Sequence, residues 1–333
     1  MKPTIYTIAE EAGVSIATVS RAFNNHSRIS EATKQKIFGI ADALGYYPSA
    51  AARSLANSTT ETIAVIMPQT SHPFFMEMIR GAESICRENQ YHLLIYTSPD
   101  VDEDDSFLSF LPSRTDGIVL CSPSSTGQYI ERLNKQRFPF VVIGRDVPGI
   151  DVNSIRPDNQ SGAYQLIDHL ITHHKYSKIA FISGPPQQDH SNQRLAGYRQ
   201  ALLDHSIPFR DDWVKTGNFE ERSGYDCTRQ FLSLPDPPQA IFAANDLMAI
   251  GVMAAATEMG YSLPHDLAIV GFDNVPSAMY LQPSLTTAGV DTYVQGRMAV
   301  EQLLNCISNP DTPHRQVVLP TPVIFRRSCG CPQ

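Results

Sequence analysis

The 333-residue chain lacks any apolar run close to the roughly 18 residues that a membrane-spanning helix requires. No basic segment followed by an apolar one precedes its first predicted helix, so we expect neither secretion nor a membrane partner. Extremes of composition are missing too, because 42% hydrophobic and 18% charged residues are ordinary values for a globular protein. These absences predict a cytoplasmic protein, and the length allows two or three packed domains.

Cysteine is sparse and scattered along the chain. A few thiols in mostly apolar surroundings suit a reducing compartment better than a disulfide framework, and the six are Cys86, Cys121, Cys227, Cys306, Cys329 and Cys331. The last two stand in Cys-Gly-Cys with no further Cys or His pair of zinc spacing beside them in the sequence. We therefore interpret this segment as a frayed tail and expect no metal and no other cofactor.

Common catalytic motifs are also missing. The sequence contains no G-x-S-x-G nucleophile turn, no H-E-x-x-H metal motif and no GxxxxGK[ST] phosphate-binding loop. An enzyme is therefore the least favoured class of function.

Basic residues are concentrated at the start of the chain. Residues 1–57 hold six Lys or Arg and four Asp or Glu residues, although the whole chain has a net charge of −8. This excess is small for a nucleic-acid-binding module, so the placement of the charges carries more information than their sum.

Two short helices are predicted in this basic segment. Thr7 and Glu10 have the spacing of a capping box, which predicts a helix that ends at Ala12, before Gly13. Ser15 is a second N-cap candidate, for a helix from Ile16 to about residue 24. Two helices joined by a turn of about three residues form a helix-turn-helix arrangement.

A third helix completes the predicted head. Ser30 is its N-cap and Gly45 its terminator, and its expected buried stripe is Ile37, Ile40 and Leu44. On the first two helices the residues expected to face inward are Ile8, Ala12, Val14, Val19 and Phe23. A generic helical bundle is the alternative that this spacing alone leaves open.

The motifs of this region resemble a known family. The segments TIAEEAGVSIATVSR, ISEAT, LGYYP and ARSL are similar to the DNA-binding head of LacI/GalR-family transcription regulators. The resemblance implies a helix-turn-helix domain over residues 1–47, followed by a hinge helix and linker over 48–61. In that hinge the family's leucine pairs with its dimer mate and wedges into the minor groove, and Arg53 and Leu55 match the motif.

Groove geometry assigns roles to the exposed residues of the second helix. Arg21 can contact a guanine, whereas Ile16 and Ala17 offer apolar contacts to bases. Short hydroxyl side chains suit phosphates. The candidate DNA-binding residues are Thr7, Ser15, Ile16, Ala17, Thr18, Ser20, Arg21, Arg53 and Leu55. The alternatives are a solvated Arg21 and a Leu55 packed on the body of the protein.

The rest of the chain alternates short apolar runs with helical stretches. Such alternation predicts α/β lobes with parallel sheets covered by helices, and the runs are 63–67, 92–96, 116–120, 140–143, 178–182, 239–243 and 267–271. Motifs such as AIFAANDLMAIG and VGFDN resemble the same family, whose sensor is similar to periplasmic sugar-binding proteins. The resemblance implies chain crossovers near Asn159, near 287–290 and near Pro320. It gives an N-terminal lobe of 62–158 with 290–320 and a C-terminal lobe of 159–289 with 321–333.

A ligand cleft is expected at the carboxyl ends of these strands. Planar polar groups and aromatic faces suit small polyhydroxylated ligands, and the candidate effector-binding residues are Phe74, Phe75, Arg145, Asp146, His190, Arg194, Phe219, Asn245 and Asp273. We interpret Asp246 as a helix N-cap rather than a ligand. Phe75 in the core, Asp273 in a simple turn and Arg194 paired with a surface carboxylate remain as alternatives.

Three positions depart from the family pattern. Gly144 stands where relatives often carry an acid, His72 where Asn is usual, and Lys175 where a helix-ending Gly is usual. These differences bear on the identity of the effector rather than on the fold.

The sequence thus predicts a ligand-responsive transcriptional repressor. We expect a homodimer on a pseudo-palindromic operator, because a two-fold protein requires matched half-sites and no leucine heptads end the chain. A sugar is the favoured effector. A solute-binding protein that delivers a sugar to a transporter is the alternative, and the helix-turn-helix head argues against it.

Overall fold

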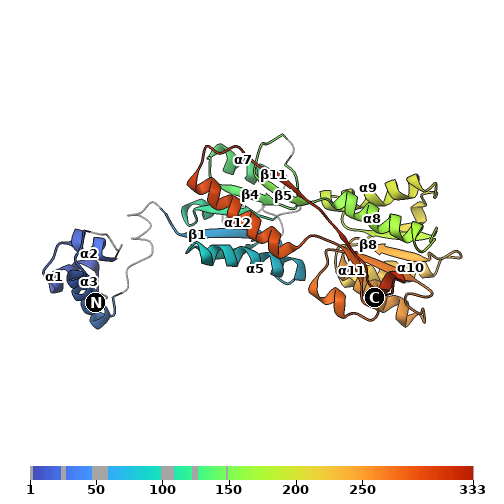
Figure 1. Ribbon diagram of the computed structural model, residues 1–333, viewed down its shortest axis with the longest axis horizontal. Coiled ribbons are helices and arrows are strands. Elements are labelled where there is room, and N and C mark those ends of the chain that lie inside the picture. Colours follow the sequence, from blue (N-terminus) through green and yellow to red (C-terminus); the bar gives the residue numbers. More distant parts are fainter. Residues whose placement is uncertain are drawn as a thin grey trace. The chain divides into compact units, whose positions relative to one another are not determined.

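The computed structural model describes residues 3–23, 28–46, 59–98, 109–121, 127–147 and 149–332 (Figure 1). Arg53 and Leu55, two of the candidate DNA-binding residues, lie outside these ranges. The chain divides into two compact units, one of residues 1–61 with 114–116 and one of 62–113 with 117–333.

The first unit contains three helices around a small apolar core. They are α1 (Ile5–Ala12), α2 (Ile16–Phe23) and α3 (Glu31–Leu44). Ser15 and Ser30 cap α2 and α3 by accepting hydrogen bonds from the backbone N–H groups of Thr18 and Thr33, as expected. Gly13 and Gly45 end α1 and α3 in the left-handed conformation, which glycine adopts without steric cost. The predicted helix-turn-helix arrangement is confirmed.

Two details of this unit differ from the prediction. α1 begins at Ile5, because Thr4 is its N-cap and Thr7 completes a capping box with Thr4 instead of with Glu10. Leu44 is 39% exposed, whereas Ala41 is buried with Ile37. Leu44 is the last residue of α3 and is not among the residues of this core. The residues expected to face inward on α1 and α2 are buried or partly buried, as predicted.

The second unit contains two six-stranded sheets. The first has the order β11 (Gln316–Leu319), β5 (Ser154–Pro157), β4 (Phe140–Ile143), β3 (Gly117–Leu120), β1 (Thr62–Met67), β2 (His92–Thr97). The second has the order β12 (Val323–Ile324), β10 (Thr286–Ala288), β9 (Ala268–Phe272), β8 (Ala240–Ala243), β6 (Ile179–Ser183), β7 (Val214–Thr216). The strands are parallel except that β12 runs antiparallel to β10, so the predicted α/β class is confirmed.

Helices lie on the faces of both sheets (Figure 1). Those that accompany the first sheet are α5 (Pro73–Glu88), α7 (Gln128–Lys135) and α12 (Thr292–Ser308). Those of the second are α8 (Asn159–Thr172), α9 (Asp189–Asp204), α10 (Glu221–Leu232) and α11 (Asp246–Glu258). Short 3-10 turns occur at η1 (Leu111–Ser113), η2 (Asp211–Trp213), η3 (Pro276–Tyr280) and η4 (Arg327–Cys329). The chain passes between the sheets after β5, after β10 and again after β11.

Strand alternation divides the core of the first sheet into two layers. Ile63, Val65 and Met67 of β1 pack on the side of α5 and α12, whereas Ala64 and Ile66 pack on the side of α7. Successive side chains of a strand point to opposite faces, so a strand covered on both faces is apolar throughout. This explains the continuous apolar runs of the sequence.

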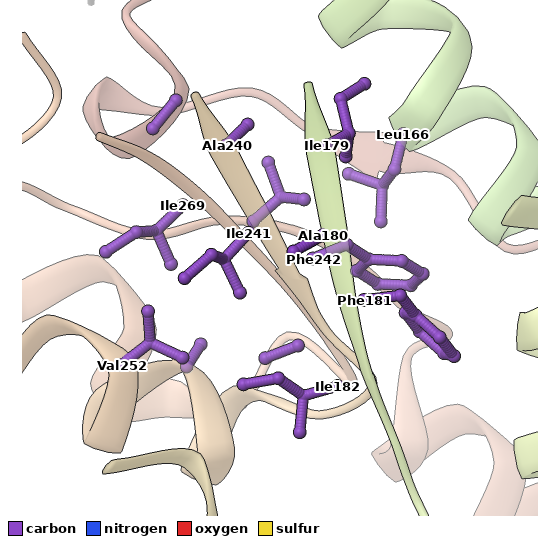
Figure 2. Close-up of a cluster of buried hydrophobic side chains, with 14 of the residues drawn as sticks. Leu166, Ile179, Ala180, Phe181, Ile182, Ala240, Ile241, Phe242, Val252 and Ile269 are labelled. Carbon is purple, nitrogen blue, oxygen red and sulfur yellow. The ribbon is translucent and has the colours of Figure 1, made fainter. Parts of the chain in front are cut away.

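The core of the second sheet is built in the same way around β6, β8 and β9. Figure 2 shows Phe181, Ile241 and Ile269 among the side chains that fill the space between these strands and their helices. Leu166 of α8 and Val252 of α11 belong to the same cluster. None of the helices in the described ranges is long and apolar enough to cross a membrane.

Candidate functional site

The DNA-reading face predicted on α2 is exposed in the structure. Ile16 is 40% exposed, Ala17 and Arg21 are exposed, and Val19 and Ala22 point into the core. Arg21 lies in the last turn of the helix. An exposed arginine on the same helix as exposed small apolar residues can reach a base edge in a groove.

Some of the hydroxyl groups proposed to contact phosphates already form hydrogen bonds within the first unit. Ser15 Oγ lies 2.9 Å from Thr18 Oγ1 and caps the helix, and Thr7 Oγ1 accepts a hydrogen bond from the Thr4 backbone. Tyr6, which sequence reasoning missed, is 69% exposed on α1. Tyr6 lies two positions before the buried Ile8, which puts it on the opposite side of the helix, and that placement is the signal that could have identified it.

A pocket lies at the carboxyl ends of the strands of both sheets. Pro68 follows β1, Cys121 follows β3, Gly144 follows β4, Asn245 follows β8 and Asp273 follows β9, and all of them line the pocket. Parallel strands place their carboxyl ends at the same edge, which is where α/β proteins bind ligands.

Most of the effector candidates meet in this pocket. Those that line it are Phe74, Phe75, Arg145, His190, Arg194, Phe219, Asn245 and Asp273. Asp146 does not line it. Its carboxylate instead accepts a hydrogen bond, at 2.7 Å, from Nε of Arg156 in β5. Proximity to Arg145 in sequence placed Asp146 in the prediction, but successive residues of an extended loop point in different directions.

Arg194 is the centre of the polar wall of the pocket. It is 4% exposed, and its Nη2 lies 3.0 Å from Asp273 Oδ1. Its Nε donates to Asn159 Oδ1, its Nη1 donates to the Ala244 carbonyl, and its guanidinium stacks 3.7 Å from the centre of the Phe272 ring. Arg194 therefore pairs with a buried carboxylate rather than a surface one.

Asp273 owes its position to an unusual backbone. Its φ of 106° and the φ of 52° at Asn274 make a tight turn directly after β9, so the predicted turn is present together with the ion pair. Burial raises the pKa of Asp273, and the charge of Arg194 opposes that effect. Burial likewise lowers the pKa of Arg194, and Asp273 opposes it. Each ion is tolerated in the interior because of the other.

Asn245 is the N-cap of α11, which corrects the assignment of that role to Asp246. The Asn245 Oδ1 accepts from the Met248 N–H, and its Nδ2 donates to the Phe219 carbonyl at 2.9 Å. Asp246 is instead the first residue of the helix and is fully buried. The prediction was one residue too late because Asn and Asp are both good caps, and the backbone conformation decides between them.

The Asp246 carboxylate forms hydrogen bonds with the segments that follow β9 and form β10. Its carboxylate accepts hydrogen bonds from the Val275 N–H at 2.8 Å and from Thr287 Oγ1 at 2.6 Å. Burial, and secondarily the nearby Asp273, raises the pKa of Asp246 to about 8. It lies outside the residues that line the pocket, so its role is to hold the turn that carries Asp273.

Aromatic side chains cover the remaining surface of the pocket. His190 stacks on Phe219 with ring centres 5.2 Å apart, and Phe74 and Phe75 make an edge contact at 5.3 Å. A side chain at Gly184 would overlap the Phe219 ring, since its Cβ would lie 1.9 Å from Cζ. Phe75 also packs against the core, so it is both a pocket residue, as predicted, and a core residue, as the alternative interpretation held.

His72 is a pocket residue that the candidate set omitted. Its Nδ1 lies 3.2 Å from the Phe74 N–H and its Nε2 lies 3.3 Å from Asn245 Nδ2, so it connects α5 with α11. A neutral imidazole has one acceptor nitrogen, so its tautomer decides which of the two contacts is a hydrogen bond. Its difference from the family pattern was the signal in the sequence.

The other two departures have conformational consequences. Gly144 has a φ of 90°, which an acidic residue could adopt only with strain, so this part of the wall carries no carboxylate at that position. Lys175 has a φ of 61°, the conformation of the helix-ending glycine that it replaces.

Comparisons with known proteins agree with this organisation. Residues 4–49 match the family model described as "Bacterial regulatory proteins, lacI family", and residues 167–329 match "Periplasmic binding protein-like domain". The chain is 33% identical over 333 residues to catabolite control protein A of Priestia megaterium, covering 98% of this chain and 99% of the relative. It is also 33% identical over 330 residues to the probable HTH-type transcriptional repressor ExuR of Bacillus subtilis, covering 98% of each.

Solved structures of similar proteins share the fold over the whole length. The lac repressor dimer bound to operator and the anti-inducer ONPF superposes with a TM-score of 0.88 at 25% identity, covering 99% of each chain. A transcriptional regulator CelR in complex with cellobiose gives a TM-score of 0.75 at 29% identity, covering 98% of this chain and 99% of that one.

The fold and the pocket therefore define a class: a helix-turn-helix transcriptional repressor with a periplasmic-binding-protein-like effector domain. Within this class the chain belongs to the LacI family of bacterial regulatory proteins. The members of this family are transcriptional regulators rather than enzymes.

Proposed function

We propose that this protein represses transcription as a homodimer on a pseudo-palindromic operator and that a sugar bound in the pocket sets its affinity for DNA. The proposal rests on two observations: α2 exposes Ile16, Ala17 and Arg21, and one pocket is lined both by aromatic rings and by the Arg194–Asp273 pair. Cytoplasmic localisation follows from the need to reach chromosomal DNA.

The organisation predicted from the sequence forms part of the proposal. Residues 1–47 bind DNA and 48–61 form the hinge and linker. The N-terminal lobe comprises 62–158 with 290–320, and the C-terminal lobe 159–289 with 321–333. Arg53 and Leu55 are proposed to contact the minor groove. An effector that changes the angle between the lobes changes the spacing of the two hinges in a dimer. A coupling of ~1–3 kcal/mol between pocket and operator is enough for regulation.

The choice of a sugar rests on the chemistry of the pocket. Stacked rings such as His190 and Phe219 suit the apolar face of a pyranose, and the charged and amide groups suit its hydroxyls. Relatives of similar fold support the choice, since one is described with cellobiose and another, from Enterococcus faecium, with bound ribose.

Arg21 tests the DNA-binding part of the proposal. The operator is first selected from random duplex DNA with the full-length protein. Arg21→Ala is then expected to weaken operator binding by ~1–3 kcal/mol and to relax the preference at the contacted base pair. Arg21→Lys is the matched control that keeps the charge but loses the two-pronged contact, so it retains non-specific binding and loses specificity. Operator affinity that is the same in all three proteins contradicts the assignment.

A thermal-shift screen tests the effector. The panel contains monosaccharides, disaccharides, other polyols and purines. A ligand at 100 times its dissociation constant stabilises the protein by about 2.7 kcal/mol, which is a clear rise in the melting temperature. Selective stabilisation by a sugar that also changes operator affinity supports the proposal. Stabilisation by purines alone shows that the effector belongs to another class.

A further inference from the structure

A cluster of metal-ligating side chains lies at the end of α8, remote from the strand ends that form the pocket. His169 belongs to the last turns of α8, His174 follows the helix, Cys329 ends η4 and Cys331 lies two residues further on. The two imidazole nitrogens and two sulfurs all lie within 4.8 Å of one another. The folded chain thus brings to the Cys-Gly-Cys tail the histidine pair that was missing beside it in the sequence.

Four of the six distances between these atoms are close to those of a tetrahedral metal site, and the other two are no longer than 4.8 Å. His169 Nε2 lies 3.2 Å from His174 Nε2, and Cys331 Sγ lies 3.3 Å and 3.4 Å from the same two nitrogens. Cys329 Sγ lies 3.9 Å from His169 Nε2. Zinc bonds of about 2.0–2.1 Å to nitrogen and 2.3 Å to sulfur, at tetrahedral angles, separate the ligand atoms by roughly 3.3–3.8 Å.

The backbone of the tail is shaped for this convergence. Gly330, between the two cysteines, has a φ of 101°, and a Cβ there would lie 3.3 Å from His174 Cε1. Just before it, Ser328 donates from Oγ to the Ile269 carbonyl and accepts from the Thr286 N–H. The cysteines are therefore carried by a segment that is fixed to β9 and β10 independently of any metal.

The imidazole rings are held in place as well. The His169 ring stacks on His173 at 5.0 Å and lies 4.2 Å from the Phe325 ring, and His174 stacks on Tyr176 at 5.6 Å. Thr286 Oγ1 lies 3.1 Å from Cys329 Sγ and can donate a hydrogen bond to it. Ligands oriented by neighbouring groups, with a donor beside a sulfur, are a usual feature of metal sites in proteins.

We propose that His169, His174, Cys329 and Cys331 form a structural zinc site that fastens the carboxyl-terminal tail to α8. Two thiolates and two imidazoles in tetrahedral arrangement select zinc among the common divalent metals, and four protein ligands leave no open position for a substrate. The His-x₄-His spacing of 169–174 falls within the range found in zinc sites. Thiol-to-imidazole hydrogen bonds without a metal are the competing explanation of the same distances.

The site is expected to act on stability and not on effector binding. Asn159 at the start of α8 contacts Arg194 of the pocket wall, whereas His169 follows ten residues later. A helical rise of about 1.5 Å per residue puts the two at opposite ends of the helix, ~15 Å apart. Zinc removal should therefore lower the melting temperature and leave the dissociation constant of a pocket ligand unchanged.

The test uses the full-length protein, stripped with EDTA, kept reduced and exchanged into metal-free buffer. Wild-type protein is expected to take up about one zinc ion per chain, measured by elemental analysis after gel filtration, with a rise in melting temperature. Cobalt in place of zinc should give the visible absorption of tetrahedral Co²⁺ bound to thiolate. Cys331→Ser and His174→Gln should lose the zinc, the shift and the cobalt spectrum.

Two matched variants separate this site from adventitious binding. His265→Gln removes an imidazole that is 88% exposed and outside the cluster, and Cys306→Ser removes a thiol of α12, so both should keep the zinc. Circular dichroism of each variant establishes that it is folded. Absence of zinc uptake by the reduced wild-type protein, or uptake that persists in both Cys331→Ser and His174→Gln, overturns the proposal.

Discussion

The two walls of the pocket are built on different physical principles. The wall on the first sheet is mainly apolar, with Phe74 and Phe75 half-buried at the start of α5. The wall on the second sheet carries the stacked rings of His190 and Phe219 and a buried polar network. In this network Arg194 contacts Asp273, Asn159 and the Ala244 carbonyl. The first wall offers mainly apolar surface, and the second also offers polar groups in fixed directions.

This difference teaches how the pocket can be both specific and tolerant. A buried ion pair is costly to assemble, and its partners are already aligned before a ligand arrives, so it can distinguish ligands by the positions of their polar groups. Aromatic surface is less directional and accepts different ligands of similar shape. We therefore expect mutations in the Arg194–Asp273 network to affect folding and binding together, and mutation of Phe74, which is not packed against the core, to affect binding alone.

Arg194→Ala should have the largest effect. It leaves the Asp273 carboxylate buried without its partner, which costs about 3–5 kcal/mol in other proteins. We expect a comparable fall in the free energy of unfolding, measured by urea denaturation, together with loss of stabilisation by the best ligand of the thermal-shift panel.

The control for this variant lies on the same helix. Arg199 is exposed on α9 and stacks on Phe209 at 4.6 Å, so Arg199→Ala should cost less than about 1 kcal/mol. Arg194→Ala/Asp273→Ala should be more stable than the sum of the two single losses predicts, because the pair is removed together. Strict additivity would show that the buried pair is not the source of the effect.

Phe74→Ala should have an intermediate effect and only on binding. Phe74 lines the pocket but, unlike Phe75, is not among the residues packed against the core of the first sheet. We expect about a tenfold loss of ligand affinity, equal to ~1.4 kcal/mol, with little change in melting temperature, measured by calorimetry. Met76→Ala is the matched control, since Met76 is 47% exposed on α5 and outside the pocket lining. A large fall in stability instead would assign Phe74 to the core.

The same contrast explains what the sequence could predict. Long apolar strands such as β1 and β9 and caps such as Ser15 and Ser30 depend on neighbouring residues, so the sequence predicts them directly. Strands of two or three residues, such as β12 and β7, carry no detectable period and were missed. Their positions depend on pairing with β10 and β6.

The site shows the same limit. The sequence named residues after strand ends, and the fold brought most of them together, but the direction of a side chain in a loop is decided by distant contacts. Asp146 points to Arg156 for that reason. The choice between Asn245 and Asp246 as the N-cap depended on the backbone conformation of Asn245, which is extended. The cysteine–histidine cluster joins the end of α8 to the tail of the chain, a pairing that no local pattern contains.

His190, which lies on α9 with Arg194, gives the smallest expected effect. Burial, and secondarily the charge of Arg194, lowers the pKa of His190 from 6.5 to about 3. Between these pH values the unfolded chain binds a proton that the folded chain does not, so stability falls as the pH decreases from about 6.5. His190→Gln removes this contribution. Because the ring borders the pocket and is only partly buried, we expect the wild-type free energy of unfolding to fall by about 1 kcal/mol more than that of the variant between pH 7 and 5. Nuclear magnetic resonance of the imidazole should show it neutral throughout this range. A midpoint near 6.5 with parallel stability profiles would place His190 with the solvated surface rather than with the buried polar wall.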